Sequence, residues 1–504
     1  MELIDLFNNI SVLDMKGNRR GDVTFLSHDS RTVTPGSLFI AIEGLKQDGH
    51  VHVPEALARG ARYVVHDRDL PYREGVTYIR VADSRSALGP LARNFYGDPS
   101  GRLSLIGVTG TNGKTTVCRL LESILSEAGH SVGVLGTINY RYAGTVLPAS
   151  HTTPEPLELQ RILRDMADSG ITHVVMEVSS HALALRRVDQ CRFDVGVFTN
   201  FSQDHLDYHG TMSDYFQAKR RFFTELLKDS SIVLNADDPS VISLIGEISK
   251  RVITFGIEGA ADAAVDNYRL TLDGIEATAH LKEQSFVIAS RLLGRHNLSN
   301  ILAAIAAASV FEVPHHAVAA GIAAVKGVRG RLERVDNNRS LSLFVDYAHT
   351  EDALRKVLAI LGEFRDGRII TVFGCGGDRD RLKRPLMGRT ATELSDMTIV
   401  TSDNPRMENP LSIISEIEEG IDKTAVKKVL PVDIGPTETG IYTVIPDRRS
   451  AITAAIRAAT PRDIILIAGK GHEDCQIVGT LRFPFDDRAV AEAAMAGALE
   501  QAAS

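Results

Sequence analysis

The feature that most constrains the fold is a glycine-rich loop between an apolar strand and an amphipathic helix, in LIGVTGTNGKTTVCRLLESIL. Glycines allow the backbone to approach an anion, amides at the helix start face it, Lys114 adds positive charge, and the Thr115 hydroxyl can hold magnesium. The common pattern has an earlier glycine where this chain has Val108, so the pattern here is G-x-x-G-K-T from Gly110. An ordinary glycine-rich turn is the alternative, but the strand and helix around the loop favour phosphate binding.

Short apolar runs alternate with segments of helical periodicity from residue 103 onward, which predicts parallel sheets covered by helices on both faces. The expected strands form two blocks. The first block comprises 103–108, 131–136, 173–178, 194–200, 231–235 and 252–255, and the second 342–347, 368–374, 397–404, 441–445 and 463–471. The fold class is therefore α/β, with a central mostly parallel sheet of the P-loop type and a C-terminal Rossmann-like sheet.

A chain of 504 residues is too long for a single hydrophobic core, so several domains are expected. The turn-forming sequence YGDP ends a smaller N-terminal α/β unit, and the polar, Gly- and Arg-rich stretch GVRGRLERVDNN separates the two strand blocks. The predicted domains are 1–98, 99–334 and 335–504.

Composition narrows the class of protein. With 56 basic and 64 acidic residues the net charge is −8, which argues against nucleic acid as a partner but allows small anionic molecules. Cys118, Cys191, Cys375 and Cys475 form no CxxC pair, which excludes a thiol zinc site and favours a reducing cytoplasm. The first residues lack the features of a signal peptide, and the longest apolar stretch, 301–325, is interrupted by charged residues and proline, so no membrane span is expected.

Three further side chains are candidates for chemistry. Glu177, in HVVMEVSSH, falls at the carboxyl end of an expected parallel strand, where a carboxylate suits magnesium. His205, in FSQDHLDYHG, can ligate a second metal ion or simply hydrogen-bond its loop. Lys219 lies within an apolar stripe at helical spacing. One interpretation is that the aliphatic part of the side chain is covered while the amine reaches water. The other is that the amine has a lowered pKa or is chemically converted.

Nine motifs can be compared together: GVTGTNGKTT, HTTPEP, MEVSSHAL, FTNFSQDHLDYHG with the following AK, GRHNLSN, DYAHT, GDRD, SDNPR and GKGHE. In this order they closely resemble the Mur ligase family, and they span nearly the whole chain. The resemblance implies three domains, the first of which binds uridine, and an ATP-dependent ligase of cytoplasmic peptidoglycan synthesis that forms ADP and phosphate. It implies small-molecule substrates, and a monomer is expected.

The resemblance also implies roles for residues around the nucleotide. Two magnesium ions are expected near Thr115, Glu177 and His205, and Lys219 matches the family's carbamylated lysine, whose added carboxylate becomes a metal ligand. Together with Lys114, the last three are the expected catalytic residues. ATP is expected at Gly110, Thr111, Asn112, Gly113, Lys114, Thr115, Thr116, Asn297, Arg331 and Asp346. Because the last two follow the hinge, domain closure is expected to complete this site.

Two further groups of residues match substrate positions of the family. The nucleotide-sugar substrate is expected at Ser30, Thr152, Thr153, Ser179 and Arg187, and the incoming amino acid at Arg379, Asp403, Asn404, Pro405, Arg406, Gly469 and Glu473. Leu185 and Glu351 depart from some relatives, which leaves one substrate contact open. Taken alone, SDNP and GKGHE can be a turn and a loop, but their positions at the ends of separate strands favour a ligand crevice.

The implied reaction phosphorylates the D-glutamate γ-carboxylate of UDP-MurNAc-L-Ala-D-Glu to an acyl phosphate, which the amine of meso-diaminopimelate attacks. The planar fork of Arg406 suits the extra carboxylate of this amino acid, and Glu473 its distal ammonium. The alternatives are the same reaction with L-lysine, a ligase like folylpolyglutamate synthetase, and a nucleotide switch without ligation. The DNPR turn and the first domain distinguish the chain from the second alternative.

Overall fold

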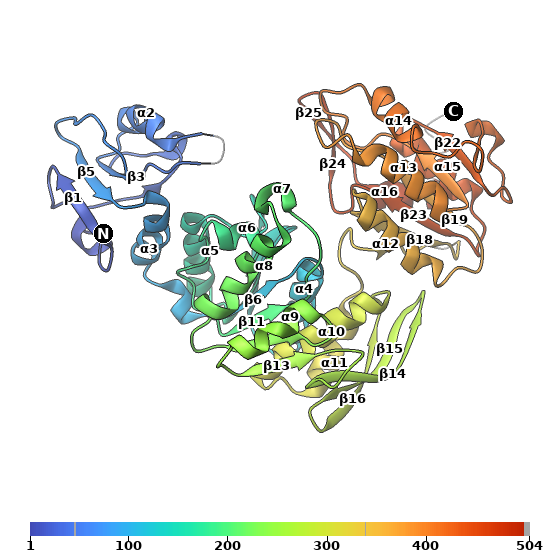
Figure 1. The fold of residues 1–504 in the computed structure, drawn as a ribbon, viewed down its shortest axis with the longest axis horizontal. Coiled ribbons are helices and arrows are strands. Elements are labelled where there is room, and N and C mark those ends of the chain that lie inside the picture. The colour runs from blue at the N-terminus through green and yellow to red at the C-terminus, as the bar shows by residue number, and fades with distance from the viewer. Residues whose placement is uncertain (45–46, 338, 498–504) are drawn as a thin grey trace. The chain divides into compact units, whose positions relative to one another are not determined.

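The computed structural model describes residues 1–44, 47–337 and 339–497. The chain forms α/β layers built on a five-stranded, an eleven-stranded and a seven-stranded sheet, which follow one another along the sequence (Figure 1). The predicted α/β class is confirmed. By its internal contacts the chain divides into two compact units. The first holds residues 1–268, 276–289 and 295–324, and the second holds 269–275, 290–294 and 325 onward.

The first sheet has the order β1-β5-β4-β3-β2, in which β1 is antiparallel and the other strands are parallel. Its strands are β1 (Val12–Lys16), β2 (Leu26–Ser27), β3 (Leu38–Ile40), β4 (Tyr63–His66) and β5 (Thr77–Val81). The accompanying helices are α1 (Leu3–Leu6), α2 (Val53–Ala58) and α3 (Ser84–Tyr96). Asp83 caps the start of α3, and Gly97, at φ +75°, ends it.

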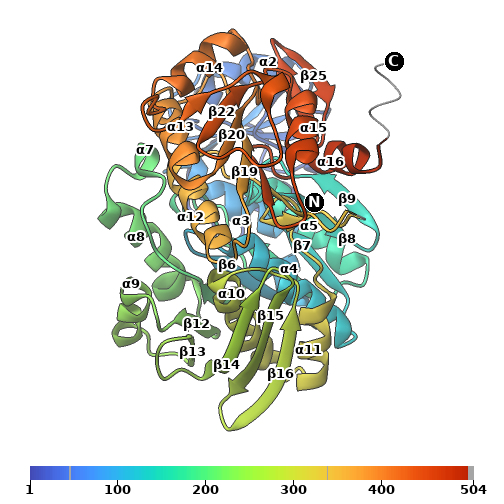
Figure 2. The same ribbon diagram turned by 90° about the vertical axis from the view of Figure 1, so that its right-hand side faces the viewer.

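The second sheet has the order β16-β15-β14-β13-β12-β11-β6-β10-β7-β8-β9. Its strands are β6 (Ser104–Thr109), β7 (Val132–Leu135), β8 (Asn139–Tyr142), β9 (Thr145–Pro148), β10 (His173–Glu177), β11 (Val195–Phe198), β12 (Ser231–Asn235), β13 (Val252–Phe255), β14 (Ala263–Thr271), β15 (Gly274–Leu281) and β16 (Gln284–Ser290). The six central parallel strands are those predicted in the first block. The strands at both edges were not predicted, and Figure 2 shows β14, β15 and β16 side by side beyond β13.

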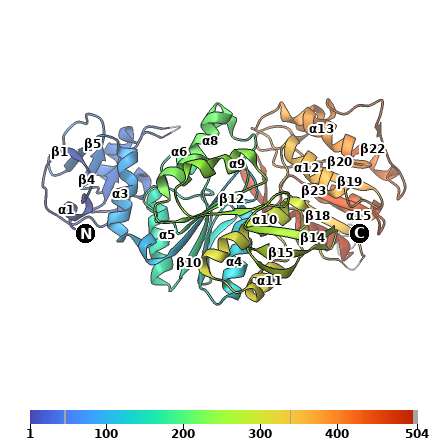
Figure 3. The same cartoon turned by 60° about the horizontal axis from the view of Figure 1, so that its bottom comes forward.

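Helices cover both faces of this sheet, with α4 and α11 on one side and α6 and α8 on the other (Figure 3). The helix predicted after the glycine-rich loop is α4, whose buried stripe includes Leu120, Leu121, Ile124 and Leu125. The helices are α4 (Lys114–Glu127), α5 (Pro156–Asp168), α6 (Ser180–Ala184), α7 (Leu206–His209), α8 (Met212–Arg221), α9 (Pro239–Ile242), α10 (Arg295–Ala308) and α11 (His315–Ala324).

The third sheet has the order β17-β18-β23-β19-β20-β22-β21 and is parallel from β18 to β21. Its strands are β17 (Glu333–Arg334), β18 (Ser342–Asp346), β19 (Ile369–Phe373), β20 (Met397–Val400), β21 (Lys427–Lys428), β22 (Ile441–Val444) and β23 (Ile464–Ala468), and β24 (Cys475–Val478) and β25 (Leu481–Pro484) form a separate hairpin. The strands of the second predicted block are all present. Because β17 pairs with β18, this sheet begins ahead of the boundary predicted at 334. The two domain boundaries, after residues 98 and 334, stay predictions.

Two apolar cores, one on each face, cover the third sheet. The helices are α12 (Glu351–Gly362), α13 (Lys383–Leu394), α14 (Pro410–Glu418), α15 (Arg448–Ala458) and α16 (Asp487–Met495). Glu351, one of the departures from the family, begins α12, where a carboxylate is favourable, and bonds Arg355 at 2.6 Å. In the described part of the chain, no helix is both long and apolar enough to cross a membrane.

Candidate functional site

The glycine-rich loop joins β6 to α4 at the carboxyl edge of the second sheet, as predicted. Two of its glycines are required by their surroundings. A Cβ on Gly110, at φ +147°, would lie 1.9 Å from the Thr199 hydroxyl, and one on Gly113, at φ +85°, would lie 2.2 Å from the Asn300 side-chain oxygen. At both positions the backbone lies so close to a neighbouring side chain that only glycine fits. Phosphate binding by this loop stays a prediction.

Two lysine side chains meet at one atom of the loop. Lys114 Nζ donates to the carbonyl oxygen of Gly110 at 2.9 Å, and Lys219 Nζ donates to the same oxygen at 2.8 Å. Lys114 also donates to the carbonyl of Thr111 at 2.8 Å. Lys219 comes from α8, and its amine lies 4.8 Å from the centre of the Tyr215 ring. Lys219, which is distant in sequence, thus contacts the backbone of the glycine-rich loop.

Lys219 is buried, with a relative exposure of 1%, so the alternative in which its head reaches water is wrong. Burial lowers its pKa well below the ordinary value, and the nearby charge of Lys114 lowers it further. No carboxylate among the described residues lies within ion-pair distance of its amine. The side chain is therefore held in a form that favours a neutral, nucleophilic amine.

Glu177 lies at the carboxyl end of β10 and is 2% exposed. Its Oε1 accepts hydrogen bonds from the Thr115 hydroxyl at 3.0 Å and from the Thr137 amide at 2.9 Å. The structure thus brings together Thr115 and Glu177, two of the predicted magnesium ligands. Hydroxyl and carboxylate oxygens beside a phosphate loop are donors that Mg²⁺ prefers, with phosphates and water completing the shell. Among the described residues there is no cluster of three or more His, Cys, Asp or Glu side chains suited to a metal ion.

His205 directly precedes α7 and has a left-handed backbone, with φ +51°. Its ring lies 4.9 Å from that of His181 and 6.0 Å from that of Tyr215, between ring centres. Burial lowers its pKa, and the nearby charge of Lys114 lowers it further. A neutral imidazole suits a metal ligand, but metal binding by His205 stays a prediction.

Three of the residues predicted for the nucleotide-sugar substrate lie together behind Glu177. The Thr153 hydroxyl donates to the carbonyl oxygen of Glu177 at 2.8 Å and accepts from the Ser179 amide at 3.1 Å. Arg187 donates to the carbonyl of Thr153 at 2.9 Å. Arg187 also pairs with Glu155 at 2.7 Å, a partner that was not predicted. The predicted substrate group therefore adjoins the predicted metal group through a single residue.

The other two predicted substrate residues have different surroundings. The Thr152 hydroxyl lies 3.1 Å from that of Thr137, which also bonds Glu177. Ser30 belongs to the first sheet's domain, where its hydroxyl donates to Glu55 at 2.7 Å. Thr152 thus joins the Glu177 group, whereas Ser30 has its own partner in another layer.

Asn297, predicted to face adenine, lies on α10 and is buried. Its side-chain oxygen accepts from Asn300 at 3.0 Å, and Asn300 is the residue against which Gly113 packs. The start of α10 is therefore adjacent to the phosphate loop.

The other two predicted nucleotide residues belong to the third sheet's unit. Both carboxylate oxygens of Asp346 are bonded to backbone amides, those of Leu332 at 2.6 Å and Ala348 at 2.8 Å. Burial raises the pKa of Asp346. The Arg331 guanidinium lies 5.3 Å from the centre of the Tyr347 ring. Asp346 thus holds the segment before β18 in place, and nucleotide contact stays a prediction for both residues.

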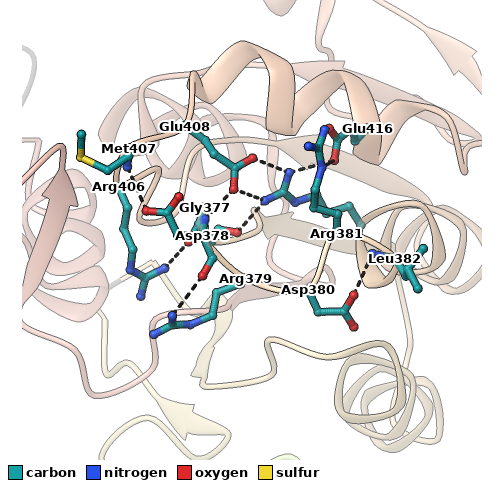
Figure 4. Close-up of polar contacts among 12 residues, drawn as sticks. Gly377, Asp378, Arg379, Asp380, Arg381, Leu382, Arg406, Met407, Glu408 and Glu416 are labelled. Carbon is teal, nitrogen blue, oxygen red and sulfur yellow. Dashed lines mark hydrogen bonds and ion pairs between the residues drawn. The ribbon is translucent and has the colours of Figure 1, made fainter. Parts of the chain in front are cut away.

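At the carboxyl edge of the third sheet, the segment after β19 meets the turn after β20 (Figure 4). Arg406 donates to the carbonyl of Gly377 at 2.7 Å, and Arg379 donates to that of Asp378 at 3.1 Å. A Cβ on Gly377 would lie 1.9 Å from the carbonyl oxygen of Pro405, so this contact requires glycine. In the described chain neither guanidinium is paired with a carboxylate, and binding of the amino acid by either stays a prediction.

Beside these arginines lies a buried polar group. Lys470 is fully buried, and its amine donates at 3.0 Å to both Asn404 and Glu473 and lies 3.6 Å from Asp403. Asn404 also donates to Glu473 at 2.7 Å. Gly469, at φ +118°, passes close to Asp403. The structure therefore brings the predicted residues of the SDNPR and GKGHE motifs together.

The sequence reasoning missed several neighbours of these groups. They are Thr137, Glu155, Tyr215, Arg384, Glu408 and Lys470. Lys470 and Glu155 had a signal, because they lie inside the GKGHE and HTTPEP motifs already singled out. The others lie beside motifs and carry no pattern of their own.

The comparisons with known proteins cover most of the chain. Residues 22–96 match the Mur ligase family catalytic domain, 108–308 the Mur ligase middle domain, and 330–471 the Mur ligase glutamate ligase domain. Two curated relatives are UDP-N-acetylmuramoyl-L-alanyl-D-glutamate–2,6-diaminopimelate ligases. The one from Geobacter metallireducens is 46% identical, with 97% of each chain covered, and the one from Geobacter sulfurreducens is 46% identical, with 98% covered. A solved structure of a ligase with the same name matches with a TM-score of 0.71 and 32% identity over 99% of each chain.

Proposed function

Because the chain belongs to the Mur ligase family, we propose that it is an ATP-dependent ligase that joins meso-diaminopimelate to the D-glutamate γ-carboxylate of UDP-MurNAc-L-Ala-D-Glu. One observation of the site carries the proposal. The amines of Lys114 and Lys219 both donate to the Gly110 carbonyl of the phosphate loop. The Thr115 hydroxyl, at the end of that loop, donates to Glu177. This arrangement suits the transfer of a phosphoryl group rather than attack by an enzyme nucleophile.

The reaction needs a leaving group on a carboxylate. The γ-phosphoryl group of ATP passes to the γ-carboxylate oxygen, which gives ADP and an acyl phosphate. The neutral amine of the amino acid then attacks the acyl carbon, inorganic phosphate leaves with the C–O bond electrons, and the amide nitrogen loses a proton. Lys114 neutralises charge on the transferring phosphoryl group, and the loop amides orient it.

The residues around Glu177 fit magnesium. We propose that Thr115, Glu177, His205 and a carbamate on Lys219 hold two Mg²⁺ ions, which when bound neutralise phosphate oxygens. The carbamate forms when the neutral Lys219 amine attacks carbon dioxide and releases a proton. The lowered pKa of Lys219 supports this, because a protonated amine has no lone pair to donate.

The choice of amino acid rests on the third sheet. We assign the second carboxylate of meso-diaminopimelate to Arg406, with Arg379 nearby, and its distal ammonium to Glu473. L-lysine lacks that carboxylate and would leave Arg406 without an anion, which disfavours the lysine alternative.

A product assay tests the proposal. The protein is incubated with UDP-MurNAc-L-Ala-D-Glu, ATP and either meso-diaminopimelate or L-lysine, and phosphate and the nucleotide tripeptide are measured. The proposal requires amide product and phosphate release that depend on meso-diaminopimelate. Lysine-dependent product would favour the alternative substrate, a folate product with added glutamate would favour the folylpolyglutamate reaction, and ATP hydrolysis independent of any amine would favour a switch.

We assign the reaction to the cytoplasm, in peptidoglycan precursor synthesis, and the active form to a monomer. The absence of any disulfide among the four cysteines supports a reducing compartment. Sedimentation of the purified protein tests the monomer.

A further inference from the structure

Arg384 is a fully buried charge that no step of the proposed reaction uses. It lies on α13 and is bonded to three separate segments of the third sheet's unit. Its guanidinium donates to both oxygens of Glu408 at 2.8 Å, to Glu416 at 2.8 Å and to the carbonyl of Gly376 at 3.1 Å. The segment after β19, the turn after β20 and α14 are therefore joined through one side chain.

Glu408 carries this connection to the predicted amino-acid site. Its Oε1 accepts from the amide of Asp378 at 2.5 Å, in the residue directly before Arg379 (Figure 4). The Asp378 carboxylate in turn accepts from the amide of Met407, directly after Arg406, at 3.2 Å. The two backbone positions that flank the predicted anion ligands are thus bonded into the Arg384–Glu408 pair.

Four arginines crowd this edge, and they differ in their partners. Arg381 and Arg384 pair with the carboxylates of Glu416 and Glu408. Arg379 and Arg406 donate to backbone carbonyls, and no carboxylate in the described chain is paired with either. Arg381 and Arg384 therefore occupy the carboxylates of Glu408 and Glu416. Arg379 and Arg406 remain able to bind the carboxylate of a ligand.

Backbone conformation makes this support necessary. Arg406 at φ +50° and Asp378 at φ +51° both occupy the left-handed region, which costs free energy for residues with a side chain. Such conformations persist only where surrounding bonds fix them. Arg406 is fixed by its own amide, which donates to Ile477 at 3.1 Å, and by its carbonyl, which accepts from Gly479 at 2.7 Å. The neighbouring amides are bonded by Glu408, by Asp378 and, from Gly377, to Asn404 at 2.9 Å.

We propose that Arg384 and Glu408 are positioning residues that set the spacing of Arg379 and Arg406 and thereby determine selectivity for an amino acid with a second carboxylate. The inference rests on the proposed function, because that amino acid is the ligand. Neither residue touches it. They act by fixing the two guanidiniums in the geometry that a carboxylate recognises.

Steady-state kinetics of Glu408→Gln test this. The variant keeps the size of the side chain but removes the charge that holds Arg384 and weakens the acceptor for the Asp378 amide. We expect the KM for meso-diaminopimelate to rise about tenfold to a hundredfold, as for loss of a hydrogen bond to a charged group. The KM values for ATP and UDP-MurNAc-L-Ala-D-Glu should stay within about twofold of wild type, because their predicted residues share no bond with Glu408. The preference for meso-diaminopimelate over L-lysine should fall as the KM for meso-diaminopimelate rises.

Glu416→Gln is the matched control. Glu416 also pairs with Arg384, but its other bond is to Arg381 and it contacts neither flanking backbone position. Its KM for meso-diaminopimelate should change less than that of Glu408→Gln at a comparable loss of Tm. Glu408→Asp gives a second measurement if Glu408→Gln does not melt cooperatively, because the shorter acid keeps its charge but cannot reach both partners. It should show the same rise in KM.

Three outcomes overturn the inference. They are an unchanged KM for meso-diaminopimelate in the folded Glu408 variants, an equal rise in the Glu416 control, and an equal rise in the KM for ATP. If wild type releases no phosphate in response to meso-diaminopimelate, the proposed function fails and this inference fails with it. If wild type does so and the Glu408 variants bind normally, only this inference fails.

Discussion

The carboxyl edges of the second and third sheets both carry buried charges, but they stabilise them differently. At the second sheet, the amine of Lys219 is bonded to a backbone carbonyl and has no paired carboxylate in the described chain. At the third sheet, Arg384 and Lys470 are fully buried and paired with Glu408, Glu416 and Glu473. The buried amine of the first edge has no paired carboxylate, whereas the buried cations of the second edge, Arg384 and Lys470, are already paired with acids. Changes at the first should therefore impair chemistry, and changes at the second should impair selection.

The largest effect is expected at Lys219. Lys219→Ala should lower the ligation rate about a thousandfold or more, because a charge-stabilising group at the reacting phosphate is lost. High bicarbonate should not restore activity, whereas short carboxylates should restore part of it by replacing the carbamate oxygens. Amino-acid-dependent phosphate release measures the loss.

Lys250→Ala is a suitable control, because its amine also donates to a backbone carbonyl, that of Phe223 at 3.4 Å, away from the loop. Near-normal activity of Lys219→Ala would exclude a role for Lys219 in holding metal.

The next effect is expected at Lys114. Lys114→Ala should reduce acyl phosphate formation about a hundredfold to a thousandfold, because the charge facing the transferring group is removed. The nucleotide-sugar should still bind, since its predicted residues are different ones. Positional exchange of ATP oxygens reports the first step and calorimetry reports binding. Exchange at the wild-type rate would show that Lys114 does not act on this group.

At the third sheet, Arg406→Ala should reduce the preference for meso-diaminopimelate over L-lysine. The expected loss is about thirtyfold to a thousandfold, or about 2 to 4 kcal/mol, because the second carboxylate loses its guanidinium. The ratio of the two kcat/KM values measures it. A ratio equal to that of wild type would assign the discrimination to another residue.

The two edges should also respond differently to pH. The pKa of Lys219 in the folded protein lies below its ordinary value, so the unfolded chain binds more protons between those two values. Stability should therefore rise with pH in that window and fall as pH is lowered. In carbon-dioxide-free buffer, Lys219→Met should be more stable than wild type by about 1 to 3 kcal/mol near pH 6, with a smaller gap at pH 9, because burial disfavours the protonated lysine and methionine has no proton to lose. Denaturant unfolding at several pH values measures the gap, and a gap that widens toward pH 9 would contradict this sign.

The smallest effect is expected for Glu408. Its hydrogen bonds with Arg384 lower its pKa to about 2, below the ordinary value of 4.5. Its stabilising contribution should therefore be complete above pH 4.5 and be lost only as the pH falls toward 2. The difference in Tm between wild type and Glu408→Gln should be constant from about pH 6 to 9 and shrink below pH 4. A difference that changes near neutral pH would point to another titrating group.

The sequence predicted the parts of this fold that are apolar and continuous. The central strands of both parallel sheets are fully buried runs, such as His173–Glu177 and Ile464–Ala468, and their pattern is unambiguous. The edge strand β9 and the middle of β14 are exposed and lack a continuous apolar run, so no pattern distinguished them. The proximity of Thr115 to Glu177 followed from the rule that ligand sites form at strand ends.

The ion pairs of the third sheet could not be predicted in the same way. Arg384 lies 24 residues from Glu408 and 32 from Glu416. A charged residue on a helix is most often on a solvated face, whereas α13 packs against α12 and α14 and Arg384 is buried. The burial of Lys219 was one of two interpretations of its apolar stripe, and its exposure of 1% decides between them.

Glu177 contributes to the two predicted groups through different atoms. Its carboxylate bonds Thr115 of the phosphate loop, while its main-chain carbonyl bonds Thr153 of the substrate group. The covalent structure of one amino acid therefore fixes the distance between the bond to Thr115 and the bond to Thr153. A contact between two packed residues would not fix such a distance. A shorter acid at this position would disturb the bonds of the carboxylate to Thr115 and Thr137 but not the bond of the carbonyl to Thr153, because every residue has that carbonyl. The side chain at position 177 can therefore change without changing the main-chain bond that holds Thr153.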